Sequence, residues 1–262
     1  MRSFLRHSLP TSLAASGLRS GPTMRSTNII GLLLVSWSCS GCSQFKPPTG
    51  YTAPSATQDT VSCEEGRHVD DADDGDSQIL GHQGRGGYLY SFVDEHGSTV
   101  QPSTSEFVVS PGGVEGQGNA MRIHGALTDA GEDVYAGMGF GLTPSTSAYD
   151  ASQYRGLEFV AKRGPDSSGF VRLKLPDVNT TPEAGKCEEC YNDFGVDFEV
   201  TEEWVRYVVD FSDLKQEQGW GSPRPENVDA TTLFGIQWQV VTKGAPFDIW
   251  VDDIAFLGCE ES

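Results

Sequence analysis

Residues 234–258, FGIQWQVVTKGAPFDIWVDDIAFLG, decide the fold class. Every second residue from 236 to 240 is apolar, and Gln237 and Gln239 stand between them. This period of two places the apolar residues on one face of an extended chain and the two amides on the other. A turn containing Gly and Pro follows, and then a second, mostly apolar run covers 247–256. Two such runs with turn residues between them indicate β-strands.

The same pattern recurs along the chain. The other runs that predict strands are 88–93, 120–124, 135–142, 157–161, 170–175 and 204–211. In the last of these, alternation places Val205, Tyr207, Val209 and Phe211 on one face. No helical periodicity lasts beyond two turns. Eight or more short strands separated by Gly, Pro and Asn turns predict an all-β sandwich or jelly roll, in one domain over 64–262.

The N-terminal segment predicts export from the cytoplasm. Residues 24–42 read MRSTNIIGLLLVSWSCSGC, in which a basic residue precedes an apolar run, 29–35, and small residues follow. The apolar run is too short to span a bilayer, so 24–41 is expected to be a secretory signal. Residues 1–23 contain no apolar run, and we interpret them as an over-extended start with Met24 as the initiator.

Cys42 follows Ser40 and Gly41, and this order resembles a bacterial lipobox, although Cys39 occupies its usual aliphatic position. The resemblance implies that the mature chain begins at a lipid-bearing Cys42, with a membrane contact through the lipid alone. By the same analogy the protein is placed at the outer membrane or cell surface. The alternative is a cleaved signal without lipid. Residues 42–63 are rich in Pro, Ser and Thr and are expected to form a flexible tether.

Charge narrows the classes of partner. The chain has a net charge of −19, and residues 1–41 carry four Arg and no acid, so their removal gives −23. A protein binds nucleic acid or another anionic polymer through clusters of Lys and Arg, so both are poor partners for this acidic chain. Neutral polysaccharide remains as a possible partner. The chain contains no HExxH, GxSxG or P-loop motif. We therefore expect no enzyme, although counting acids does not exclude a pair of carboxylates for glycoside hydrolysis.

Besides Cys39 and Cys42, the chain contains four cysteines: Cys63 at the end of the predicted tether, and Cys187, Cys190 and Cys259 in the predicted domain. An even number in an oxidising compartment predicts two disulfides. Local pairing within Cys187-Glu-Glu-Cys190 is the simplest arrangement, and it leaves Cys63 and Cys259 to join the two ends of the domain. A zinc site is the alternative, but a single CxxC without a second pair is a weak zinc signal.

Several stretches resemble β-jelly-roll carbohydrate-binding modules of family 11 and the related CIA30-like, galactose-binding-like domains. They are VDDADDGD (69–76), GNAMRIHG (118–125), EEWVRYVVDFSDL (202–214) and the closing segment 234–258. The chain departs from the family pattern in having Ala72 for Phe, Asp210 for Pro and Asp253 for Asn. The resemblance implies a single jelly-roll domain that binds carbohydrate without cleaving it.

An acidic cluster suggests a structural calcium ion. Five Asp residues lie within 70–76, and Asp252 and Asp253 lie in the predicted last strand. Clustered carboxylates repel one another unless a hard cation with oxygen ligands neutralises them. By the family resemblance, the first and last strands are neighbours and the ligands are Asp71, Asp73 and Asp252. The alternative is a solvated acidic turn.

The predicted binding residues are of two kinds. Outward-facing strand positions supply hydrogen bonds: Arg172, Lys174, Gln237 and Gln239. The resemblance adds three aromatic rings against which a sugar stacks: Tyr90, Tyr135 and Trp220. An aromatic residue on a strand more often belongs to the core, which is the competing interpretation.

The second functional hypothesis is a structural or adhesive envelope protein that uses the same fold for protein contacts. A groove with two or more exposed aromatic residues favours sugar, whereas a flat apolar patch favours a protein partner.

Overall fold

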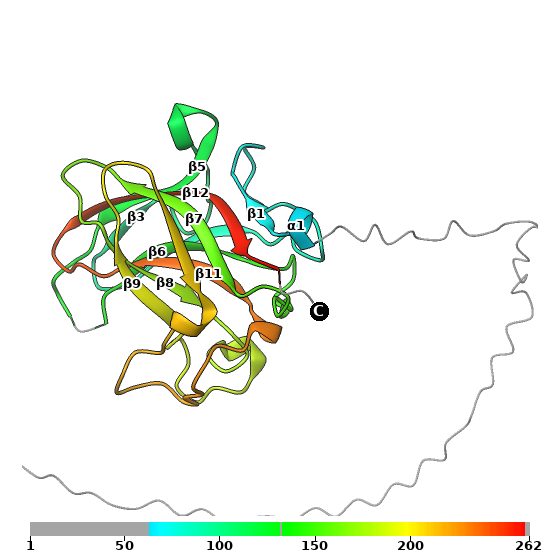
Figure 1. The fold of residues 1–262 in the computed structure, drawn as a ribbon. Coiled ribbons are helices and arrows are strands. Elements are labelled where there is room, and N and C mark those ends of the chain that lie inside the picture. Colours follow the sequence, from blue (N-terminus) through cyan, green and yellow to red (C-terminus); the bar gives the residue numbers. More distant parts are fainter. Residues whose placement is uncertain (1–62, 132, 260–262) are drawn as a thin grey trace, which may run out of the picture. The chain divides into compact units, whose positions relative to one another are not determined.

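The computed structural model describes residues 63–131 and 133–259. They form two antiparallel β-sheets with only short helical turns, as Figure 1 shows. The predicted signal, Cys42 and almost all of the tether lie outside the described residues. Within the described part, no helix is long and apolar enough to cross a membrane.

The larger sheet has seven strands in the order β10-β7-β12-β5-β3, with β1 added to β12 and β4 added to β5. Its strands are β1 (His68–Asp70), β3 (Thr99–Gln101), β4 (Ser110–Pro111), β5 (Asn119–Ala126), β7 (Gly156–Arg163), β10 (Val205–Asp210) and β12 (Pro246–Leu257).

The smaller sheet has five strands in the order β2-β6-β11-β8-β9. Its strands are β2 (Leu89–Val93), β6 (Ala136–Gly141), β8 (Phe170–Leu175), β9 (Phe194–Glu199) and β11 (Gly235–Val240). The helical turns are α1 (Cys63–Gly66), η1 (Val114–Gly116), η2 (Pro182–Ala184), η3 (Phe211–Asp213) and η4 (Ala230–Thr232).

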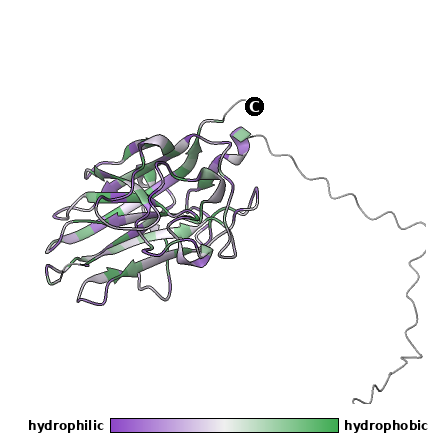
Figure 2. Ribbon diagram, turned by 90° about the horizontal axis from the view of Figure 1, so that it is seen from below, coloured by the Kyte–Doolittle hydropathy of each residue, from purple (hydrophilic) through white to green (hydrophobic). Residues whose placement is uncertain are grey.

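The core lies between the two sheets, because alternate side chains of each strand point inward. Leu173 of β8 and Trp238 of β11 are buried on this side. The Trp238 ring meets Phe159 of β7 edge-on, with ring centroids 5.3 Å apart, and so joins the two layers. Figure 2 shows hydrophobic residues along the strands and hydrophilic ones in many loops. The predicted all-β sandwich is confirmed.

The prediction for 204–211 was only partly right. Tyr207 and Val209 pack against the core, but Val205 is 38% exposed and Phe211 belongs to η3 rather than to the strand. β10 is an edge strand, so its inward face is covered only partly. β9 was not predicted from the sequence, although Phe194, Val196 and Phe198 alternate within it.

A disulfide joins the two ends of the described domain. Cys63 and Cys259 are bonded with their Cα atoms 5.9 Å apart, and β1 pairs with β12 beside them. Figure 1 shows α1 close to the end of β12. Cys187 and Cys190 form the second disulfide. Both predicted pairings, and the predicted adjacency of the first and last strands, are therefore present.

The two disulfides are expected to contribute unequally to stability. Cys63–Cys259 spans 196 residues and Cys187–Cys190 spans three. Loop-closure entropy assigns about 5 kcal/mol to the long link and about 2 kcal/mol to the short one. Urea unfolding of Cys63→Ser/Cys259→Ser should therefore show a larger loss of unfolding free energy than Cys187→Ser/Cys190→Ser. An equal or reversed order would contradict this expectation.

Candidate functional site

The outer face of the five-stranded sheet brings several predicted binding residues together. The strand register places Tyr90 beside Gly139, Gly139 beside Gln237, and Gln237 beside Lys174, in one row across four strands. The Gln237 amide donates to the Tyr90 hydroxyl over 2.8 Å. Burial raises the pKa of Tyr90 to about 12, so its phenol stays neutral at physiological pH.

A cavity of about 370 Å³ lies at one end of this face. Gly141 and Gly235, which pair across β6 and β11, contribute no side chain to it. A Cβ on Gly235 would lie 2.5 Å from the carbonyl oxygen of Phe140, so no larger residue fits there without movement. The remaining lining residues are Tyr88, Tyr90, Thr143, Pro144, Ser145, Thr146, Pro176, Thr181, Pro182, Glu183, Tyr191, Asp193, Phe234 and Gln237.

Two exposed tyrosines reach this cavity from opposite edges of the sheet. Tyr88 directly precedes the edge strand β2 and is 57% exposed, and Tyr191 lies three residues before the other edge strand, β9, and is 64% exposed. Neither tyrosine is among the predicted binding residues. Tyr88 lies two residues before Tyr90 and so shares its face of the strand, and this alternation could have identified it as a binding residue. Tyr191 lies in a loop where no periodic pattern marks it.

The cavity carries acidic but no basic lining. Its charged lining residues are Glu183 and Asp193, and none of its described lining residues is Lys, Arg or His. Asp193 is buried and forms an ion pair with Lys174 at 2.9 Å. Hydroxyl groups of Thr143, Ser145 and Thr146 add neutral hydrogen-bonding groups. This lining suits an uncharged ligand with hydroxyl groups better than an anion.

Arg172 lies on the predicted face but is not open to solvent. Its side chain is largely buried, with Nη1 3.0 Å from Asp197 Oδ1 and Nη2 donating to the Lys215 carbonyl over 2.6 Å. The expectation of an outward-facing, available Arg172 is therefore corrected: the loop that contains Lys215 covers it. Lys174 is likewise half-buried and also donates to Gln239 over 3.3 Å.

Two predicted aromatic residues do not line the cavity. Tyr135 is partly exposed and packs near Phe92, with ring centroids 6.3 Å apart. Trp220 is exposed in the loop after η3, where its indole N–H donates to Glu217 Oε2 over 2.9 Å. Their contact with a sugar stays a prediction.

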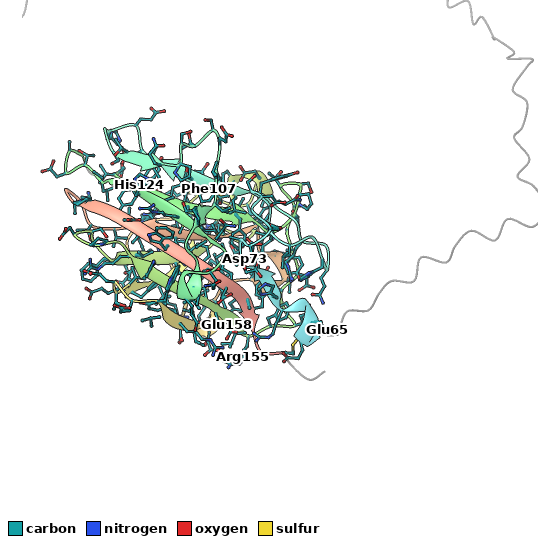
Figure 3. All side chains as sticks on the ribbon, turned by 90° about the horizontal axis from the view of Figure 1, so that it is seen from above. Glu65, Asp73, Phe107, His124, Arg155 and Glu158 are labelled. Atoms are coloured by element: carbon teal, nitrogen blue, oxygen red, sulfur yellow. A yellow bond between two sulfur atoms is a disulfide. The ribbon has the colours of Figure 1, made fainter. Side chains whose placement is uncertain are left out.

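The acidic cluster fastens a glycine-rich loop. Asp73 Oδ1 accepts from the Asn119 amide over 2.9 Å, and Asp252 Oδ2 accepts from the Val114 amide over 2.8 Å. The first bond ties residues 112–119 to the turn after β1, in which Figure 3 labels Asp73, and the second ties them to β12. Asp71 accepts from the backbone amide of Asp73. Within the described ranges, no three His, Cys, Asp or Glu side chains are placed to hold a metal ion. The calcium ion therefore stays a prediction.

Asp70 is the most constrained member of this cluster. Only 2% of it is exposed, and its Oδ1 atom has no hydrogen-bond partner. Burial, with the charges of Asp74 and Asp71 nearby, raises its pKa to about 7. Burial also raises the pKa of Asp252 to about 6. Both shifts mark a place where ionisation is costly.

Comparison with known proteins establishes the fold. No family model and no curated protein matches the sequence. The family 11 carbohydrate-binding module of the cellulosomal cellulase Lic26A-Cel5E of Clostridium thermocellum matches with a TM-score of 0.52 at 17% identity, over 75% of this chain and 97% of that chain. The family 30 module of the cellulosomal cellulase Cel9D-Cel44B from the same organism matches with a TM-score of 0.47 at 18% identity, over 71% and 98%. The first likeness shows that the chain is a β-sandwich jelly roll.

Replacing Asp70 should stabilise the protein in a pH-dependent way. The unfolded carboxyl loses its proton near pH 4, whereas the folded one loses it near pH 7. The contribution of this group to the unfolding free energy therefore falls as pH rises from about 4 to about 7. In EDTA, Asp70→Asn should be more stable than wild type by about 2 to 4 kcal/mol at pH 8 and by much less at pH 4. Urea unfolding measures both differences.

The exposed Asp150 provides the control, since Asp150→Asn makes the same chemical change without burial. A difference in unfolding free energy between Asp70→Asn and wild type that does not grow with pH would contradict the raised pKa of Asp70.

Calcium added to the chelated wild-type protein at pH 8 tests the predicted ion separately. An unchanged melting temperature would contradict the calcium prediction.

Proposed function

We propose that this protein binds a neutral polysaccharide, without cleaving it, on the outer face of the five-stranded sheet. The observation that carries the proposal is the cavity of about 370 Å³ with Tyr88 and Tyr191 exposed within it and Tyr90 beside Gln237. Tyrosine rings offer apolar faces to the C–H faces of sugars, and amide and hydroxyl groups bind the hydroxyl rim.

The charges of the site favour an uncharged ligand. Lys174, the cation nearest in the strand register, already pairs with the buried Asp193, and Glu183 adds a negative charge at the cavity. The whole chain carries −19. Uronate or sulfate groups would therefore meet repulsion here, whereas neutral sugars would not.

The shared jelly-roll fold supports the proposal but does not establish it, because one fold hosts many functions. A flat apolar patch would favour the alternative, a structural or adhesive envelope protein. The cavity with exposed tyrosines fits the sugar hypothesis better.

We further propose that the protein is held at the outer membrane or cell surface by a lipid on Cys42. The support is the order of charged, apolar and small residues in 24–42. Labelled fatty acid should enter the wild-type protein in cells and should not enter Cys42→Ser. Equal labelling of both would contradict the lipid site.

Affinity gel electrophoresis tests the binding proposal. Gels that contain soluble β-glucan or galactomannan should retard the wild-type protein, and gels that contain polygalacturonate should not. Tyr88→Ala should weaken retention by about tenfold or more, because a central aromatic contact carries a large share of binding energy. Thermal unfolding should show that the variant remains folded.

Val208→Ala is the matched control, since Val208 is exposed on β10 of the other sheet. It should bind as wild type does. Retention by polygalacturonate alone, or equal retention of Tyr88→Ala and wild type, would contradict the proposal.

A further inference from the structure

Tyr191 combines exposure with an unusual backbone conformation. Its φ angle is 72°, in the left-handed region that bulky residues rarely adopt. The residue is nevertheless 64% exposed and lines the cavity. A residue is held in such a conformation only when its surroundings determine it strongly. An outlier that presents an exposed ring to a cavity suggests a role in binding rather than in packing.

Both backbone groups of Tyr191 are engaged. Its N–H donates to the carbonyl of Thr180 over 2.9 Å, and its carbonyl accepts from Lys174 Nζ over 3.2 Å. Lys174 is itself fixed by its ion pair with Asp193 at 2.9 Å. The main chain at Tyr191 is therefore tied to the β8–β9 connection and to β8.

The residues on either side of Tyr191 are also fixed. Cys190 is bonded to Cys187, and within this loop the amides of Glu188 and Glu189 donate to the Ser222 carbonyl over 2.9 and 3.3 Å. The Ser222 amide donates back to the Glu189 carbonyl over 3.1 Å.

Asn192, which follows Tyr191, is almost fully buried. Its Nδ2 atom donates to the carbonyls of Glu217 and Trp220 over 3.0 and 2.7 Å. The loop around Trp220 thus fixes the residue that follows Tyr191.

We propose that the Cys187–Cys190 disulfide is a positioning element that holds the exposed Tyr191 ring as one aromatic wall of the cavity. The ring then determines how tightly a sugar unit is held between the two edges of the sheet, because a preformed contact loses less conformational entropy on binding. This inference rests on the proposed function and adds to it a residue and a covalent support.

A mutant cycle tests the coupling between the disulfide and the ring. The purified protein, Tyr191→Ala, Cys187→Ser/Cys190→Ser and the triple variant are compared by affinity electrophoresis in β-glucan and galactomannan gels. Tyr191→Ala should bind about tenfold or more weakly, and the serine pair several-fold more weakly. The triple variant should bind no more weakly than Tyr191→Ala, because the disulfide acts through the tyrosine. Tyr191→Phe, which keeps the ring, should retain most of the affinity.

The control variant Cys63→Ser/Cys259→Ser removes the disulfide that joins the chain ends and should lose stability but keep its affinity. Hydrogen exchange provides a readout that needs no sugar: the Tyr191 amide should be protected in wild type and lose protection in Cys187→Ser/Cys190→Ser. If the Tyr191 amide is equally protected in both proteins, or if Cys187→Ser/Cys190→Ser is retained as strongly as wild type, the role of the disulfide is wrong but the proposed function stands. No retention of wild type on any neutral gel would overturn the proposed function and this inference with it.

Discussion

The pairing of β12 with its neighbours is the constraint on which the rest of the structure depends. β12 pairs with β5 along one edge, with β7 along the other, and with β1 near its end. It thus joins a segment near the start of the domain to two strands from its middle. A one-residue shift of β12 would turn Ile249 and Val251 out of the core and bring Trp250 into it. The register of β12 therefore fixes which side of the larger sheet meets the smaller one.

The same alternation creates the candidate site. In the smaller sheet, residues that point inward form the core, so residues that point outward are free to carry other chemistry. Trp238 is buried against Phe159, whereas its neighbours Gln237 and Gln239 face away from the core. Gly141 and Gly235 leave space where side chains would otherwise fill the face. Packing thus decides which residues remain available for binding.

The sequence predicted the part of this structure that periodicity encodes. The alternation of 170–175 and 236–240 predicted β8 and β11, with the apolar residues of 236–240 on one face and Gln237 on the other. Four cysteines predicted both disulfides. Periodicity says nothing about what a neighbouring loop covers, so the burial of Arg172 beneath the loop of Lys215 was not foreseen. Tyr191 was missed for a related reason, since its placement depends on the bond of its amide to Thr180 and on the bonds of the preceding Glu188 and Glu189 to the distant Ser222.

The Cys63–Cys259 bond has a mechanical consequence. Tension that reaches Cys63 from the preceding chain passes through a covalent bond to Cys259, two residues beyond the end of β12. The load therefore enters the sheet beside a central strand and does not first peel the three-residue β1 away from its partner. A domain joined in this way resists being pulled apart from its N-terminal side for as long as the two sulfur atoms remain bonded.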